Sequence, residues 1–198
     1  MVGLLGVAGY ETSTLVRLDP TTLRPLPGRR VRLEVNFVGW SVSPDRSLAV
    51  VGDGNNQGMV EVVDLGAMRS LGTIPLRPGA STMASGWLGP RRVAVVLDGP
   101  GGPCQVAILD PVARRMLACR ALAGDLSGVG RFPGGLVLLL TPAGAIGPAR
   151  LAVVQGRGVV RTVALGRISA GFRPPKVEGA EAVARQRAPG LAVDPAGR

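Results

Sequence analysis

The chain of 198 residues contains no histidine, so its candidate chemistry rests on carboxylates and arginines. Without histidine there is no Ser-His-Asp or Cys-His catalytic arrangement and no histidine-ligated metal. Asp53 and Asp98 each precede a glycine in a loop that follows an apolar run. Carboxylate oxygens can ligate a divalent cation, but Asp-Gly is also the composition of a tight turn. Both interpretations stay open, and we assign no catalytic residue, metal ligand or cofactor.

A second group of charged residues lies in segment 169–189, which we expect to be a loop insertion. Its basic side chains are Arg173, Lys176, Arg185 and Arg187. Long loops on rigid scaffolds often carry binding residues, so these four are candidate partner-binding residues. A solvated loop without a binding role is the alternative.

The formal net charge is +10, and Lys176 is the one lysine among 23 basic residues. This balance permits polyanion binding. However, the arginines are scattered, aromatic residues make up 3% of the chain, and no basic run contains interleaved aromatics. An arginine-rich, lysine-poor composition with abundant Ala, Gly and Pro indicates GC-rich coding. We therefore expect no nucleic-acid partner. The longest apolar run, 136–140, is far too short for a membrane span.

The elements that must position these residues are short apolar strands that recur about 45 residues apart. The first three end at Asp19, Asp64 and Asp110, which we expect to cap their own hairpin turns. A period of roughly 40 to 50 residues made only of short strands is typical of a β-propeller of four-stranded antiparallel blades. The four recurring segments are 16–19, 60–64, 106–110 and 151–155.

This repeat predicts an all-β fold, a single propeller domain with about three complete blades plus partial ones. Middle strands such as 48–51 and 93–96 are apolar at successive positions, so both of their faces should be covered. We expect Trp40, Trp87 and Phe132 to pack between blades. The expected blades are 2–33 (partial), 37–77, 84–122 and 127–168, followed by the insertion at 169–189 and the start of a next blade at 190–198.

The ring is expected to be incomplete, and the chain to be a fragment of a longer propeller. The first blade lacks its innermost strand, whereas 190–198 reads as an innermost strand and its turn. The alternative is a closed four-blade ring, in which 191–193 pairs with 2–7. Cys104 and Cys119 should be diagonal neighbours on one hairpin, near the limit for a bridge, so we expect reduced thiols.

The units resemble the repeats of bacterial YVTN-type and WD40-like β-propeller proteins. The resemblance rests on VRLDPTTLRPLPGRRV at 16–31, WSVSPDRSLAVVGDG at 40–54 and GLAVDPAGR at 190–198. The Gly-His and Trp-Asp signature of WD40 repeats is absent. Because the matching residues are strand cores and turns, the resemblance implies a fold and carries over no catalytic residue.

The sequence predicts a non-enzymatic scaffold or binding module rather than an enzyme. Loops 52–58, 98–103, 141–148 and 169–189 should share one face, which we expect to meet a protein, peptide or glycan partner. The alternative is a propeller hydrolase resembling bacterial lactonases, with carboxylates and a divalent cation. The lack of histidine and the presence of only 13 acidic residues favour the binding module.

Overall fold

The computed structural model describes residues 2–6, 13–98, 105–173, 184–186 and 191–192. All regular structure in these residues is β-strand, arranged in four antiparallel sheets of three, four, four and five strands. The described part of the chain therefore contains no helix that is long and apolar enough to cross a membrane.

Each sheet is a meander of strands that follow one another in the chain. The first sheet holds β1 (Val2–Gly6), β2 (Ser13–Leu18) and β3 (Pro25–Arg32). The second holds β4 (Phe37–Val42), β5 (Leu48–Asp53), β6 (Met59–Asp64) and β7 (Arg69–Pro75). The third holds β8 (Ser81–Gly89), β9 (Arg92–Asp98), β10 (Val106–Asp110) and β11 (Arg115–Arg120). The fourth holds β12 (Asp125–Phe132), β13 (Gly135–Thr141), β14 (Ile146–Gln155), β15 (Val159–Arg173) and β16 (Ala184–Gln186).

The outer hairpins of the first three sheets turn in the same way. Asp19, Asp64 and Asp110 accept hydrogen bonds from backbone N–H groups two or three residues further on. The residue four positions after each aspartate has a left-handed φ between 51° and 58°. An aspartate that satisfies the turn amides stabilises this tight reversal. The predicted capping role of the three aspartates is confirmed.

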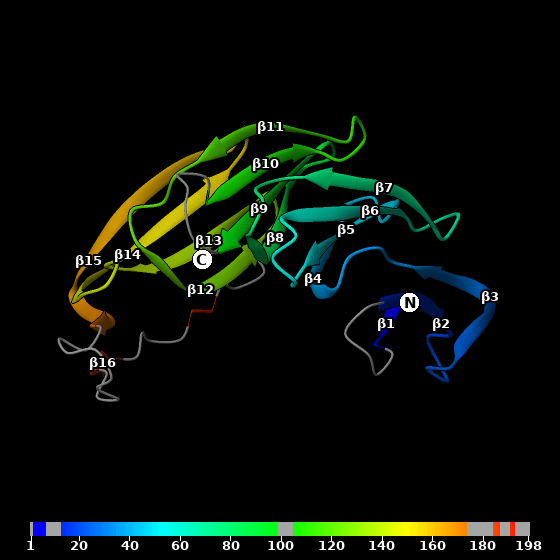
Figure 1. Ribbon diagram of the computed structural model, residues 1–198, viewed down its shortest axis with the longest axis horizontal. Coiled ribbons are helices and arrows are strands. Elements are labelled where there is room, and N and C mark those ends of the chain that lie inside the picture. The colour runs from blue at the N-terminus through cyan, green and yellow to red at the C-terminus, as the bar shows by residue number, and fades with distance from the viewer. Residues whose placement is uncertain (1, 7–12, 99–104, 174–183, 187–190, 193–198) are drawn as a thin grey trace.

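The sheets pack face to face as successive blades along an arc (Figure 1). Three apolar clusters fill the spaces between the first and second, second and third, and third and fourth blades. Strand β9 shows why the middle strands are apolar at successive positions. Val93, Val95 and Leu97 face the second blade, whereas Ala94 and Val96 face the fourth.

Arginines connect the blades as well. Three of them cross to a neighbouring blade and donate a hydrogen bond to a backbone carbonyl oxygen there. The pairs are Arg17 Nη2 with Leu65 O at 2.7 Å, Arg114 Nη1 with Leu71 O at 2.7 Å, and Arg131 Nε with Ser85 O at 2.8 Å.

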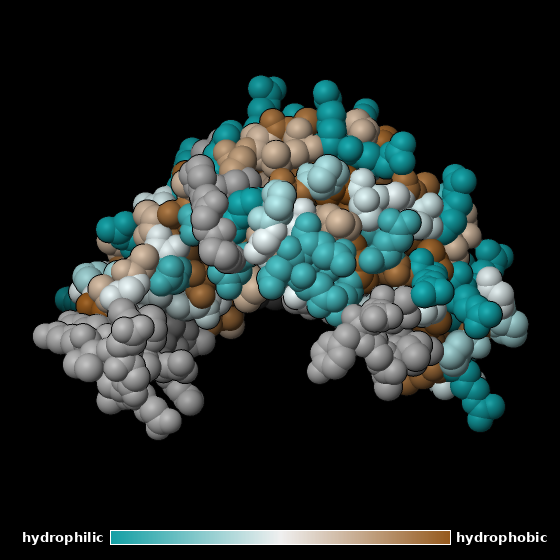
Figure 2. Space-filling view, in the orientation of Figure 1, coloured by the Kyte–Doolittle hydropathy of each residue, from teal (hydrophilic) through white to brown (hydrophobic). Residues whose placement is uncertain are grey.

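The ring is incomplete, as expected, and the propeller fold class is confirmed. The two ends of the arc lie apart, and the arc is hollowed on its inner side (Figures 1 and 2). Strand β1 pairs with β2. Leu191 belongs to no strand, and its Cβ would lie 3.5 Å from a Cβ added to Gly128 on β12. Val7 and Val193 lie outside the described residues.

Segment 169–189 differs from the expected loop insertion. Strand β15 continues to Arg173, and β16 pairs with its end. The sheet extends because β14 begins early, at Ile146, and because residues 166–168 of β15 form a bulge beside Pro148, whose partner is Ser169. Proline lacks a backbone N–H and is tolerated at a bulge, so it does not end the strand pair here.

Candidate functional site

Asp53, one of the predicted site residues, is fully buried at the end of β5. Its Oδ1 accepts a hydrogen bond from the Asn36 N–H at 3.3 Å. Its Oδ2 accepts from the N–H groups of Asn55 at 3.2 Å and Gln57 at 2.8 Å. Both carboxylate oxygens are therefore used to fix the loop after β5 and the linker before β4. This geometry matches the turn interpretation of Asp53 rather than the ligand interpretation.

Asp98 is exposed at the end of β9, at the same end of the blades as Asp53. Its register partner is Ser81 on β8. The next residue, Thr82, donates to the Asp53 carbonyl oxygen at 2.9 Å. The two aspartates thus lie at the same end of the blades. Among the described residues, no three acidic or sulfur side chains gather to hold a metal ion.

The predicted basic residues are only partly within the described chain. Arg173 ends β15, and Arg185 lies on β16 opposite Phe172. The structure therefore brings these two onto adjacent strands. Lys176 and Arg187 lie outside the described residues.

Glu61 is a buried carboxylate that the sequence analysis missed. It lies on β6 and is 0% exposed. Its Oε2 accepts hydrogen bonds from the N–H groups of Glu34 at 2.6 Å and Val35 at 3.3 Å. Asp53 accepts the N–H group of Asn36 in the same way. The backbone N–H groups of residues 34, 35 and 36 therefore all donate to two buried carboxylates. The signal was present in the sequence, since one glutamate interrupts the apolar run at 59–63.

Surface hollows lie at the opposite end of the blades from Asp53, here called the turn face. Three hollows of about 550, 500 and 640 Å³ follow one another there, an inner, a middle and an outer one. The inner and middle hollows share Phe132, Pro133 and Gly134, and the middle and outer hollows share Leu88, Gly156 and Arg157. We call the continuous depression the turn-face groove. The turns on this face are 43–47, 89–92, 110–114, 133–134 and 155–158.

The inner hollow is aromatic and is built from the ends of three innermost strands. Trp40 on β4, Trp87 on β8 and Phe132 on β12 line it together with Arg131. Trp87 is 7% exposed and belongs to the core between blades, as predicted. Trp40 and Phe132 are half-buried, so each also offers ring surface to the groove.

The outer hollow is basic and lies between the third and fourth blades. Arg91, Arg92, Arg115 and Arg157 line it, with Asp110 as the one carboxylate in the lining. The sequence contained a pattern that could have indicated basic residues on the turn face, because an arginine follows each turn aspartate by five residues. The pairs are Asp19 with Arg24, Asp64 with Arg69, and Asp110 with Arg115.

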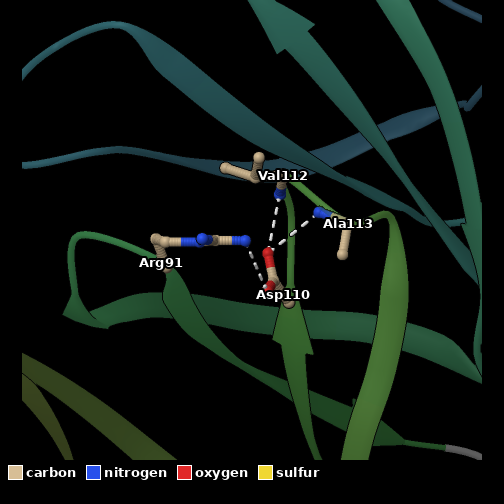
Figure 3. Close-up of polar contacts among 4 residues, drawn as sticks. All are labelled: Arg91, Asp110, Val112 and Ala113. Atoms are coloured by element: carbon tan, nitrogen blue, oxygen red, sulfur yellow. Dashed lines mark hydrogen bonds and ion pairs between the residues drawn. The ribbon is translucent and has the colours of Figure 1, made fainter.

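Asp110 anchors one of these arginines (Figure 3). Its Oδ1 accepts the N–H groups of Val112 at 3.0 Å and Ala113 at 2.9 Å, and its Oδ2 lies 3.3 Å from Nη2 of Arg91. The pKa of Asp110 is lowered, chiefly by the Ala113 N–H and then by the positive charge of Arg91, although desolvation opposes the shift. The aspartate is thus held as an anion that fixes the turn and orients Arg91.

Cys119 on β11 is disulfide-bonded, so the expectation of a reduced thiol is wrong for this residue. The chain's other cysteine, Cys104, lies outside the described residues. Strand pairing places Cys119 opposite Ala107, directly beside the pair formed by Val106 and Arg120.

No protein-family model and no curated protein matches the sequence. Solved structures do match the fold. Hydrazine synthase from Kuenenia stuttgartiensis aligns with a TM-score of 0.60 at 14% identity, over 79% of this chain and 48% of that one. The dihydro-heme d1 dehydrogenase NirN in complex with DHE aligns with a TM-score of 0.59 at 19% identity, over 85% of this chain and 38% of that one. The Dos1 propeller aligns with a TM-score of 0.54 at 12% identity, over 81% of this chain and 48% of that one.

This chain spans less than half the length of each of these three structures. At such identities the likeness shows the fold alone. Together with four successive antiparallel blades, it defines the chain as a β-propeller protein.

Proposed function

We propose that this chain is a non-enzymatic β-propeller binding module that holds an acidic segment of a partner protein in the turn-face groove. The observation that carries the proposal is the continuity of an aromatic inner hollow with a basic outer one. An aromatic or apolar side chain of the partner fits the inner end, where half-buried rings offer contact area. Its acidic residues then meet guanidinium groups further out.

The charge of the groove favours an acidic partner over a neutral glycan. Six arginines line the three hollows and one carboxylate, that of Asp110, accompanies them. A neutral ligand would add no counter-charge beyond Asp110, whereas an acidic segment supplies negative charges and gains orientation and association rate. The arginines are Arg131, Arg157, Arg161, Arg91, Arg92 and Arg115.

Two alternatives, a metal-dependent hydrolase and a partner surface on the loop face, have less support. Asp53 is fully buried and accepts backbone hydrogen bonds with both carboxylate oxygens, which supports the binding module over a metal-dependent hydrolase. The resemblance to bacterial YVTN-type repeats is compatible with a binding module. A second partner surface on the loop face, with Arg173 and Arg185, stays a prediction.

Fluorescence polarisation with a short labelled peptide of glutamate and glycine around a central phenylalanine tests the proposal. Binding should be weaker by about tenfold or more when Arg161→Glu reverses a charge in the middle hollow. Arg30→Glu, an exposed change on β3 outside the groove, should have little effect. Equal binding of a lysine-containing version of the peptide, or equal losses in the two variants, would overturn the proposal.

A further inference from the structure

The outer hollow carries more positive charge than an ordinary acidic residue would need. We propose that it is a subsite for a phosphate group, carried on a side chain of the acidic segment that occupies the groove. This inference rests on the proposed function and names the chemistry of the partner.

The four arginines of the outer hollow come from three separate turns or strand starts. Arg91 and Arg92 lie at the β8–β9 turn, Arg115 begins β11, and Arg157 lies in the β14–β15 turn of the next blade. Residues so far apart in the chain meet here because the turns of two blades share one face. The hollow thus belongs to the packed propeller rather than to any single loop.

Among the described residues, four guanidinium groups and one carboxylate line this hollow. Asp110 bonds its own turn and pairs with Arg91, and its negative charge also acts on Arg115. In the described part of the chain, Arg92, Arg115 and Arg157 form no ion pair within 4.0 Å. The described lining of this hollow therefore carries an excess of positive charge, which a bound anion offsets.

Phosphate fits this hollow better than a carboxylate does. A phosphate monoester carries a charge of about −1.5 to −2 near neutral pH and offers three acceptor oxygens, whereas a carboxylate carries a single charge. Guanidinium groups bind phosphate oxygens through two parallel N–H donors, so several arginines can share one phosphate group.

The walls of the hollow are held in position before any ligand binds. Arg91 pairs with the carboxylate of Asp110, which also accepts hydrogen bonds from two backbone N–H groups of its own turn. The β14–β15 turn packs so closely on the third blade that a Cβ added to Gly158, which has a φ of +84°, would lie 2.5 Å from Ile108 Cγ1. Arg157 is therefore presented from a turn that cannot move away easily. Fixed donors lose less entropy on binding.

The phosphate should arrive on the same segment that fills the inner hollow. Leu88, Gly156 and Arg157 line both the middle and the outer hollow. A peptide anchored beside Trp40 and passing Phe132 therefore reaches the arginines without leaving the groove.

The test compares three versions of the labelled acidic peptide that differ at one position: serine, glutamate and phosphoserine. The phosphoserine version should bind at least about tenfold tighter than the serine version. In an Arg92→Ala, Arg157→Ala double variant this preference should fall to about twofold or less, whereas Arg30→Ala should keep it. Far-UV circular dichroism and unfolding midpoints should show that each variant is folded. Arg92→Lys with Arg157→Lys, which keeps the charges but not the paired donors, should retain part of the preference.

The outcomes separate this inference from the proposed function. If the acidic peptides bind but phosphoserine gives no advantage, the phosphate subsite is wrong and the binding module stands. If phosphoserine is preferred equally in wild type and the double variant, the subsite is elsewhere and this assignment is overturned. If no peptide binds while inorganic phosphate still raises the unfolding midpoint through Arg92 and Arg157, the peptide-borne ligand and the proposed function both fail.

Discussion

At the scale of single residues, two buried carboxylates act as acceptors for backbone amides. Glu61 and Asp53 together receive the N–H groups of residues 34, 35 and 36. Buried amides must be paired, and a linker between blades has no neighbouring strand to pair them. The carboxylates provide the missing acceptors, so their role is to join the first blade to the second.

Glu61→Ala should lower the free energy of unfolding by about 2 to 4 kcal/mol, because two linker amides lose their acceptor. Glu61→Gln should cost less, since it keeps one acceptor oxygen. Chemical denaturation followed by tryptophan fluorescence measures both. Glu34→Ala is the matched control, because the exposed Glu34 contributes its backbone and not its side chain to this contact. Equal losses in Glu34→Ala and Glu61→Ala would contradict the assignment.

Asp110 should make stability depend on pH. Since its pKa is lower in the folded protein, its contribution is present above the unfolded pKa of about 3.9 and is lost as the pH falls through the folded value. Asp110→Asn should therefore be less stable than wild type at neutral pH, with a difference that shrinks in acid. Urea midpoints at several pH values measure it. A difference that stays constant as the pH falls into the acid range would contradict this role of Asp110.

Cys119 should resist alkylation until the protein is reduced, because its sulfur is already bonded. Mass spectrometry of the peptide that contains Cys119, after iodoacetamide with and without prior reductant, checks this. Full labelling of the native, unreduced protein would show that the thiol is free.

The residue-scale interpretation from sequence was correct for the turn aspartates and incomplete for the site. Asp19, Asp64 and Asp110 act within a few residues, so local sequence predicts them. Arg92 and Arg157 meet only because the third and fourth blades stack, and no local pattern encodes that proximity. The periodic Asp-to-Arg spacing was the available clue.

At the scale of elements, the innermost strand of the third blade closely approaches the second strand of the fourth, at a point where a glycine replaces a side chain. A Cβ on Gly86 of β8 would lie 2.4 Å from Leu136 Cδ2, and Leu136 is fully buried in the next blade. The corresponding Gly39 of β4 has no atom within 4 Å of such a Cβ. The same Gly-Trp pair therefore has a packing role in one blade and not in its neighbour.

Gly86→Ala should destabilise the protein by about 1 to 3 kcal/mol through overpacking, and Gly39→Ala should be nearly neutral. Thermal unfolding of both variants makes the comparison. Combining Gly86→Ala with Leu136→Ala should cost less than the sum of the single changes, because the methyl group occupies space that Leu136 vacates. Additive losses would place the strain elsewhere.

The apolar runs and the Gly, Pro and Asp turns predicted most strands at this scale. The fourth blade departs from the expectation because β14 and β15 continue past Pro148 through a bulge. A proline in a sequence indicates the end of a strand. Whether the strand continues through a bulge depends on the strand that pairs with it, which the local sequence does not show.

At the scale of the whole molecule, the blades differ in how they are covered. The second and third blades have a neighbour on each face, as the three apolar clusters show, whereas the first and fourth lie at the ends of the arc (Figure 1). Hydrogen exchange monitored by mass spectrometry should find the slowest amides in β5 and β9 and faster exchange in β2. Equal protection of β2 and β9 would argue against this arrangement.

The blade architecture could be predicted because the same pattern of short strands and turns recurs four times in the sequence. The sharing of a groove by several blades could not, since it depends on how far each blade is rotated against the next. That rotation is set by contacts such as Gly86 with Leu136 and Gly158 with Ile108, which lie in different repeats.

The joint at residues 34–36 also has a consequence for synthesis on the ribosome. Glu61 follows Glu34 by 27 positions, so the linker amides have no acceptor while the second blade is still being translated. The first blade emerges before the residues that lock it in place. This joint is completed only once the third strand of the second blade has been made, which lets the blades assemble in the order in which they are made.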